Sequence, residues 1–195
     1  MKKISLYLIF LIAERVSLPG RVVRAFGEAR AREIMAVVDR INHAVHDYIA
    51  LKSFVSFLQG MLSFVVLAAF GVDFAVMWGV LIFLFNFIPY IGSFVAVSLP
   101  ILLSFLQYAE EPWKPVVITL LLLVIQRVVD NYIEPRLTGQ KLGLSPLIVL
   151  LSLAFWGWLW GIVGMVLAVP LTVICKIILE NIRETKPLAT LISNV

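Results

Sequence analysis

Four polar residues interrupt the apolar helix predicted over residues 115–133. They are Gln126, Arg127, Asp130 and Asn131. At 1.5 Å per residue, Arg127 lies about 18 Å from Pro115 along the helix axis, beyond the middle of a bilayer rather than at its edge. An ionisable side chain there costs about 3 kcal/mol unless it is paired or hydrated, so it should face protein or water. Arg127 and Asp130 are three residues apart on one helix face, which allows an ion pair.

Two roles remain open for this polar patch. A structural ion pair would lock neighbouring helices together near the inner interface of the membrane. Alternatively, the patch contacts a substrate or exchanges protons, with Glu134 just beyond the helix as a further titratable carboxylate. The two roles differ in whether transport survives removal of the Arg127 and Asp130 side chains.

A second candidate site lies where the chain reverses between two apolar runs, 74–88 and 91–108. The residues that mark this break are Asn86, Pro89 and Gly92. The proline lacks a backbone N–H and disfavours helix at the preceding residue, while the glycine permits a tight reversal. The runs are therefore predicted to pack as a hairpin, and a broken helix at membrane depth is how many transporters build their binding sites. A simple turn is the alternative. Gln59 of the preceding span could hydrogen-bond across to the break, but a plain inter-helical contact is the favoured role for it.

The last apolar stretch, Leu147 to Cys175, contains no charged residue. As one helix it would be about 43 Å long, which exceeds the roughly 30 Å of hydrocarbon but is too short for two full spans. Its small residues predict a hairpin bent near Trp158 to Gly161, with arms that pack closely. The predicted packing residues are Gly157, Gly161, Gly164, Ala168 and Pro170.

These residues are set in a chain that is too apolar for a soluble fold. Of its 195 residues, 62% are hydrophobic and 14% are charged, against about 25% charged in a soluble domain. The net charge of +4 is explained by Lys and Arg in cytoplasmic loops, so no nucleic-acid partner is expected. The sequence predicts an all-α fold: a polytopic transmembrane helix bundle with broken helices, helical hairpins and an N-terminal amphipathic helix, in contact with the lipid bilayer.

Three regions are predicted from the charge distribution. Residues 1–53 combine a short apolar start with a charged amphipathic helix at the cytoplasmic membrane face, residues 54–180 form the transmembrane bundle, and residues 181–195 form a polar cytoplasmic tail. The amphipathic helix carries an apolar stripe that should lie against the membrane surface or against neighbouring helices. The stripe consists of Ile34, Val37, Ile41, Ala44, Tyr48 and Leu51.

The orientation follows from the basic residues of the short loops. Residues 14–52, the loop 134–146 and the C-terminus are rich in Lys or Arg and are predicted to be cytoplasmic. Between these segments, the runs from 54 to 133 cross the membrane alternately. The final hairpin goes out and returns.

No enzymatic chemistry, cofactor or metal site is predicted. The chain has no phosphate-binding Gly-rich loop, no H-E-x-x-H and no G-x-S-x-G motif. His43, His46 and Asp47 lack further ligands at matching spacing, and Cys175 is the single cysteine, which reads as a small buried hydrophobe.

A set of motifs, in this order and at these distances, resembles the autoinducer-2 exporter family of bacterial membrane proteins over roughly residues 14–185. The motifs are Asn86-Phe87-Ile88-Pro89-Tyr90-Ile91-Gly92, Gln126, Glu134-Pro135-Arg136, Gly139, Leu144-Ser145-Pro146 and Gly161-x-x-Gly164-x-x-x-Ala168-x-Pro170. The resemblance implies a multi-pass protein of the bacterial inner membrane that forms homo-oligomers. It also implies that this chain is the C-terminal part of a longer family member.

The resemblance implies a transport function rather than an enzyme. We expect a permease or exporter of a small polar solute, with the quorum-sensing signal autoinducer-2 as one candidate, and with the break and the polar patch along the route. A sodium/proton antiporter that titrates Asp130 or Glu134 is the first alternative. A truncated membrane subunit with only a packing role is the second.

Overall fold

The computed structural model describes residues 2–138 and 144–182, with 2–19 and 138 described by their backbone only, and within these ranges the regular structure is helical. The predicted all-α bundle is confirmed. The helices are α1 (Lys2–Ala69), α2 (Ala75–Phe85), α3 (Ile91–Gln107), α4 (Trp113–Val128), the π-helix η1 (Val129–Ile133), α5 (Glu134–Thr138) and α6 (Pro146–Asn181).

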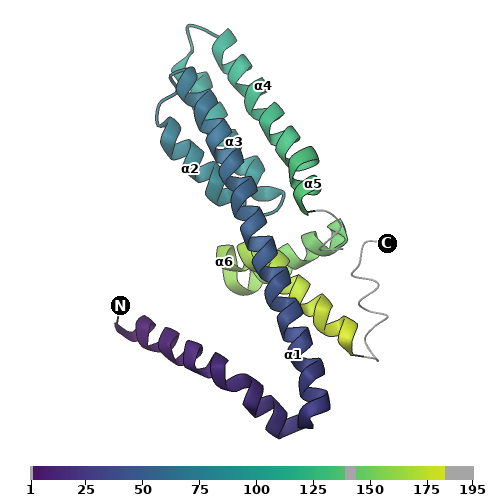
Figure 1. Cartoon of the computed structure of the whole chain (residues 1–195). Helices are drawn as coiled ribbons and strands as arrows, with labels where there is room; N and C mark the ends of the chain where they lie inside the picture. Colours follow the sequence, from purple (N-terminus) through teal and green to yellow (C-terminus); the bar gives the residue numbers. More distant parts are fainter. Residues whose placement is uncertain (1, 139–143, 183–195) are drawn as a thin grey trace.

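Helix α1 is the axis of the molecule (Figure 1). It bends once, at Gly27, whose φ of 76° and ψ of 163° are not helical. From Glu28 to Ala69 it then continues without a break, which corresponds to about 60 Å. The charged amphipathic segment and the following apolar span are thus two halves of one helix, and each half packs on different partners.

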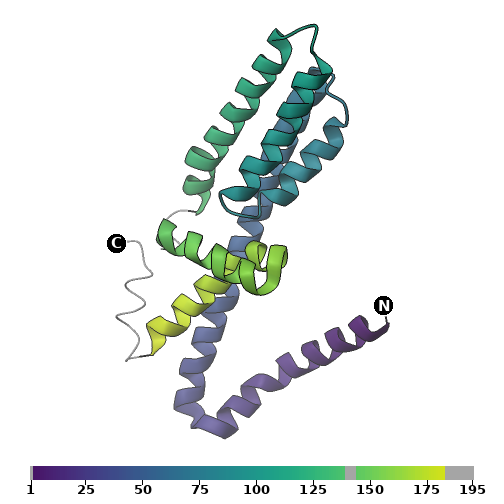
Figure 2. The ribbon, with the colours of Figure 1, turned by 180° about the vertical axis from the view of Figure 1, so that it is seen from behind.

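The C-terminal part of α1 packs with α2 and α4, and α3 packs on α2 and α4 from the other side. The four helices run alternately up and down, as Figures 1 and 2 show. Their shared core contains buried aliphatic side chains from every one of them, which are Leu67, Val72, Ile82, Ala96, Val97, Ile118 and Leu122. The acidic residues Asp73, Glu110 and Glu111 lie in the turns at one end of this bundle, and the break between α2 and α3 lies at the other.

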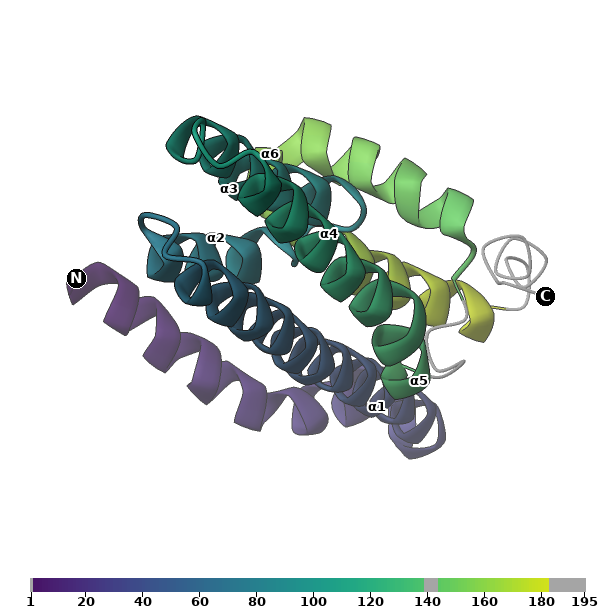
Figure 3. The ribbon, with the colours of Figure 1, turned by 90° about the horizontal axis from the view of Figure 1, so that it is seen from above.

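Helix α6 is a hairpin that lies beyond the broken end of the bundle (Figure 1), and Figure 3 shows its two arms from above. Its two arms meet at Gly161, where φ is 63° and ψ is −142°, so the bend predicted near Trp158 to Gly161 is confirmed. Leu153 and Ala168, one from each arm, pack against Ile88 of the break. The second arm, through Val169, Val173 and Ile177, packs on the part of α1 between Val37 and Tyr48.

The contacts of α6 explain the apolar stripe of the amphipathic segment. Four of its predicted members pack against the second arm of α6, namely Val37, Ile41, Ala44 and Tyr48. A salt bridge of 2.9 Å between Arg40 and Glu180 flanks this contact. The stripe therefore serves packing against a neighbouring helix.

The loop predicted over residues 134–146 begins later than expected. The chain stays helical to Thr138, although Pro135 lies within it as the second residue of α5. Proline removes one helix hydrogen bond and crowds the carbonyl four residues earlier. The chain accommodates it by widening into the π-helix η1 and by placing Pro135 in the first turn of α5, where an N–H has no helical partner in any case. Residues 139–143 of this loop lie outside the described residues, as does the predicted tail from 183.

Three helical stretches in the described part of the chain are long and apolar enough to cross a membrane: Gly20–Ala69, Trp113–Leu137 and Pro146–Asn181. Helices α2 and α3 are apolar but shorter. Large hydrophobic side chains cover the outside of the molecule, including Phe94, Leu106 and Trp158, which are 72 to 83% exposed. Such a surface is stable in lipid and not in water, so the chain is a membrane helix bundle.

Candidate functional site

A row of polar side chains runs along the buried face of α1. Its members are Lys52, Ser56, Gln59 and Ser63, all between 0 and 5% exposed. Their spacing of four, three and four residues places them within an arc of about 60°, and they extend over about 16 Å of helix. We call these four residues the α1 polar row. Because buried polar groups are rare in the interior of a membrane bundle, this row is the strongest candidate for a functional site.

A salt bridge lies at the Lys52 end of the α1 polar row. The Lys52 ammonium donates to Glu134 Oε1 at 2.7 Å, with 6% of the lysine side chain and 26% of the glutamate side chain exposed. Tyr48 and Asp130 interact electrostatically with the same glutamate, and Asp130 also interacts electrostatically with Lys52. One buried lysine thus faces two carboxylates at the junction of α4, η1 and α5.

The break between α2 and α3 meets the row one turn further along. Asn86 follows the last residue of α2 and is 3% exposed. Its amide Nδ2 donates to Ser56 Oγ at 3.0 Å. Asn86 of the break and Glu134 beyond the patch, 48 residues apart in sequence, therefore both contact α1, on side chains four residues apart.

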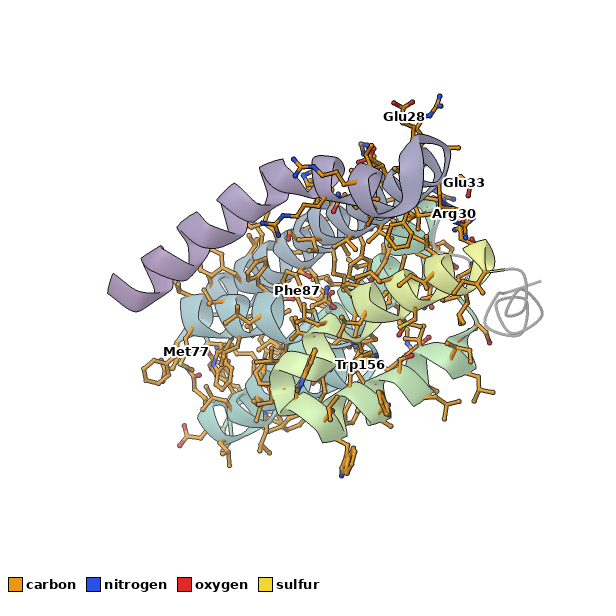
Figure 4. All side chains as sticks on the ribbon, turned by 90° about the horizontal axis from the view of Figure 1, so that it is seen from below. Glu28, Arg30, Glu33, Met77, Phe87 and Trp156 are labelled. Atoms are coloured by element: carbon orange, nitrogen blue, oxygen red, sulfur yellow. The ribbon has the colours of Figure 1, made fainter. Side chains whose placement is uncertain are left out.

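Gly92 and Pro89 shape the break in different ways. A Cβ on Gly92 would lie 1.7 Å from the Phe85 carbonyl oxygen, so only glycine allows the start of α3 to lie so close to the end of α2. Pro89 leaves its own carbonyl free to accept from the Ile91 N–H at 2.7 Å, which closes the turn. Figure 4 shows Phe87, in this turn, among the packed helices, whereas Glu28, Arg30 and Glu33 project from the distant bend of α1.

Gln59 is buried in the row without a hydrogen-bond partner in the described part of the chain. Among the described residues, neither its amide nitrogen nor its amide oxygen has a hydrogen-bond partner, although the side chain is fully buried. A buried polar group left unpaired costs roughly 1–3 kcal/mol. The hydrogen bond from Gln59 to the break that the sequence suggested is not formed, because Ser56 takes the Asn86 amide.

The predicted polar patch is divided between two faces of its helix. Gln126 and Asp130 are half-buried and lie on the same side as Glu134, whereas Arg127 and Asn131 are exposed. Gln126 and Arg127 both act electrostatically on the Asp130 carboxyl. Among the described residues, however, no salt bridge joins Arg127 to Asp130. The ionic partner in this region is Lys52, to which Glu134 is bound.

Sequence comparison bears directly on these features. The profile of the AI-2E family transporters matches residues 4–184, a range that includes the break, the patch and both arms of α6. The chain belongs to the AI-2E transporter family.

The similar proteins of this family differ in how far their function is known. The AI-2 transport protein TqsA of Escherichia coli is 41% identical over 192 residues, which cover 97% of this chain and 54% of TqsA. A candidate transport protein of Borreliella burgdorferi is 37% identical over 183 residues, which cover 94% of this chain and 51% of that protein. The chain spans about half the length of the curated relatives it matches.

The small residues that carry part of the AI-2E resemblance have two structural uses in α6. A Cβ on Gly164 would lie 1.9 Å from the Trp156 carbonyl oxygen, and one on Gly157 would meet Met165 at 2.9 Å, so both glycines permit close packing of the arms. Ala168 and Pro170 are buried in the second arm. Gly161, predicted as a packing residue, has no neighbour within 4 Å of a Cβ position, and its positive φ makes the turn instead.

Three of the four members of the α1 polar row in this AI-2E chain were not predicted from the sequence. Lys52 reads as the end of a charged segment, and Ser56 and Ser63 read as small residues within a span. Their spacing was the available signal, since polar residues at steps of four and three share one helix face. That periodicity does not show that the face is buried.

For metals, the described part of the chain contains no group of three or more His, Cys, Asp or Glu side chains that would hold an ion.

Proposed function

We propose that this AI-2E chain forms the pathway of a permease or exporter for a small polar solute, with autoinducer-2 as the first candidate. The observation that carries the proposal is the α1 polar row, buried at membrane depth and joined to a helix break at Ser56 and to an ion pair at Lys52. TqsA, named as an AI-2 transport protein, is 41% identical. The substrate is therefore a proposal made by similarity.

The proposed route passes between the break at 86–92 and the segment 126–134. In the state seen here the route is closed, because Lys52 binds Glu134 and Ser56 binds Asn86. A solute enters when these contacts separate, and its polar groups then replace those that the side chains lose. Transporters of this kind use irregular backbone where it lines such a pathway.

A sodium/proton antiporter is the second candidate. It is favoured by two carboxylates, Asp130 and Glu134, that share one buried lysine. Exchange of a proton for a cation at this pair would couple ion movement to the release of Lys52.

The experiment uses the purified chain in lipid vesicles. Uptake of labelled autoinducer-2 tests the first candidate, and a pH-sensitive dye inside the vesicles, with a sodium pulse outside, tests the second. Asp130→Ala and Arg127→Ala variants that insert and assemble like the wild type are measured beside it. Undiminished autoinducer-2 uptake in both variants would remove the patch from the route. Absence of both solute uptake and proton movement in the wild type would leave the chain with a packing role only.

The orientation is part of the proposal: residues 14–52, the loop 134–146 and the C-terminus in the cytoplasm of a bacterial inner membrane. Single cysteines at Glu28 and Glu110, in a Cys175→Ala background, test it with a membrane-impermeant maleimide. We expect labelling of the cysteine at position 110 in intact cells and of the cysteine at position 28 only after lysis. The reverse pattern would invert the topology.

A homo-oligomer is also proposed. Arg127 and Asn131 face outward at membrane depth, where a charge exposed to lipid is costly. A second copy that covers this face would remove the cost. Light scattering of the detergent-solubilised wild type and of Arg127→Leu reports the oligomer, and a monomeric mass for the wild type would contradict it.

A further inference from the structure

Gln59 is enclosed by the helices of this chain itself. Its side chain is fully buried, one turn beyond Ser56 and one turn before Ser63. Its amide carries two donors and an acceptor, and among the described residues none of these finds a partner. Buried polar groups in native proteins are almost always satisfied, so this exception calls for a ligand or a second state.

A neighbouring protein helix cannot be the missing partner. A helix from another copy, or from a longer chain, would pack on the outer surface of the bundle. Because Gln59 has no exposed surface, such a helix could not reach its amide without displacing the helices that bury it. A molecule small enough to enter between the helices, a water or a small solute, can satisfy the group.

The chemistry of the α1 polar row limits what that molecule is. Beyond Lys52, whose charge is compensated by Glu134, the row presents two hydroxyl groups and one primary amide and no net charge. A cation would require carboxylates, and an anion would require Arg or Lys. An amide between two hydroxyls can bind a ligand group that both donates and accepts hydrogen bonds. The hydroxyl is the simplest ligand group of this kind.

We propose that Gln59 is a solute-binding residue, which with Ser56 and Ser63 holds a neutral, hydroxyl-bearing solute inside the bundle. This assignment rests on the proposed permease function and names the substrate class and the contact residue. When Asn86 leaves Ser56, the serine hydroxyl becomes free to join the amide of Gln59. The break then admits the solute and supplies the first hydroxyl of its binding site.

The test compares two glutamines of the same chain. Gln59→Leu removes the unpaired amide with little change in volume. Gln107→Leu is the matched control, because Gln107 has structural partners: its amide donates to the Gly71 carbonyl at 2.9 Å and accepts from the Asp73 N–H at 3.0 Å. Both variants and the wild type are placed in vesicles. Uptake of labelled autoinducer-2, competition by the neutral polyol erythritol and by sodium chloride, and the thermal unfolding temperature are measured.

We expect Gln59→Leu to lower uptake by about tenfold or more, because one hydrogen bond to the solute is lost. The unfolding temperature should not fall. Gln107→Leu should lower the unfolding temperature and leave uptake per folded molecule unchanged. Erythritol should compete with uptake in the wild type, and sodium chloride should not. Gln59→Asn, which keeps the amide but shortens its reach, should raise KM more than it lowers kcat.

Several results would overturn the assignment. Wild-type uptake by Gln59→Leu, or a loss of uptake that only follows a loss of stability, would make Gln59 a structural residue or a bystander. Competition by sodium in place of erythritol would assign the row to a cation. Failure of the wild type to move autoinducer-2 or erythritol is a separate result that overturns the permease function itself, and this assignment with it.

Discussion

Lys52 binds Glu134 across 2.7 Å, although 82 residues separate them in sequence. The bridge connects the middle of α1 to the first residue of α5. The same glutamate is the electrostatic neighbour of Asp130, so the lysine compensates two carboxylates. Any motion that separates α1 from the end of α4 must break this bridge. The bridge therefore stabilises the fold, and it must break for the proposed route to open.

Removing the lysine should destabilise the protein strongly. In Lys52→Met, the Glu134 carboxylate loses its cation while it stays mostly buried, and breaking one side of such a pair costs about 3 kcal/mol or more. Denaturant unfolding in detergent measures the change. The charge-reversed double variant, Lys52→Glu with Glu134→Lys, should recover a large part of the loss. No recovery would mean that packing of the lysine stem, and not its charge, holds the contact.

The matched control for this prediction is a surface pair. Lys114 binds Glu111 at 2.6 Å, but the glutamate side chain is 49% exposed. Surface pairs contribute roughly 0–1 kcal/mol because water and salt screen them. Lys114→Met should therefore change the free energy of unfolding by less than about 1 kcal/mol. An equal effect of the two lysines would contradict the burial of the Lys52 bridge.

The hydrogen bond between Asn86 and Ser56 should appear as coupling between the break and α1. Asn86→Ala and Ser56→Ala each remove one side of a buried bond of 3.0 Å. The single variants should each lose about 1–3 kcal/mol of stability, and the double variant less than their sum by about 1 kcal/mol. Additive losses in the double-mutant cycle would show that the two side chains do not interact in the folded protein.

Local backbone features of this fold could be predicted from the sequence. Pro89 and Gly92 mark the break, and Gly161 marks the hairpin of α6, because proline and glycine act on their own segment of backbone. The apolar stripe of α1 also follows from its own periodicity. These features depend on a few neighbouring residues, and they are where the structure agrees with the sequence.

The candidate site was only partly predictable. The partner of Glu134 is distant in sequence, and nothing near the glutamate distinguishes Lys52 from Arg127 as its cation. The π-helix η1 turned Asp130 toward α1 and left Arg127 outside, and a helical wheel with a constant turn cannot anticipate that rotation. The burial of Gln59 likewise arises only when other helices pack against α1.

Gly161 should be sensitive to substitution for conformational reasons alone. Its φ of 63° and ψ of −142° lie in a region that is almost restricted to glycine, while a Cβ at this position would meet no neighbour. Gly161→Ala should therefore cost about 1–3 kcal/mol from backbone strain. Gly161→Asn should lose about as much in a thermal unfolding assay, because asparagine tolerates positive φ only in the left-handed helical region, where ψ is about +45°, whereas ψ here is −142°. An unchanged unfolding temperature in Gly161→Ala would show that the hairpin does not need this backbone conformation.

Gly92 should be the glycine that tolerates substitution least. A Cβ there would lie 1.7 Å from the Phe85 carbonyl oxygen, which belongs to backbone and cannot move aside like a flexible side chain. Gly92→Ala must therefore push α3 away from α2, and we expect a loss of about 3 kcal/mol or more, at the upper end of overpacking effects. Gly20→Ala is the control, since a Cβ at Gly20 meets nothing within 4 Å and alanine favours helix. Because the displacement of α3 would also separate Asn86 from Ser56, hydrogen exchange at the break should rise in Gly92→Ala and not in Gly20→Ala. A stable Gly92→Ala protein with unchanged exchange would show that the two helices do not approach as closely as this hairpin requires.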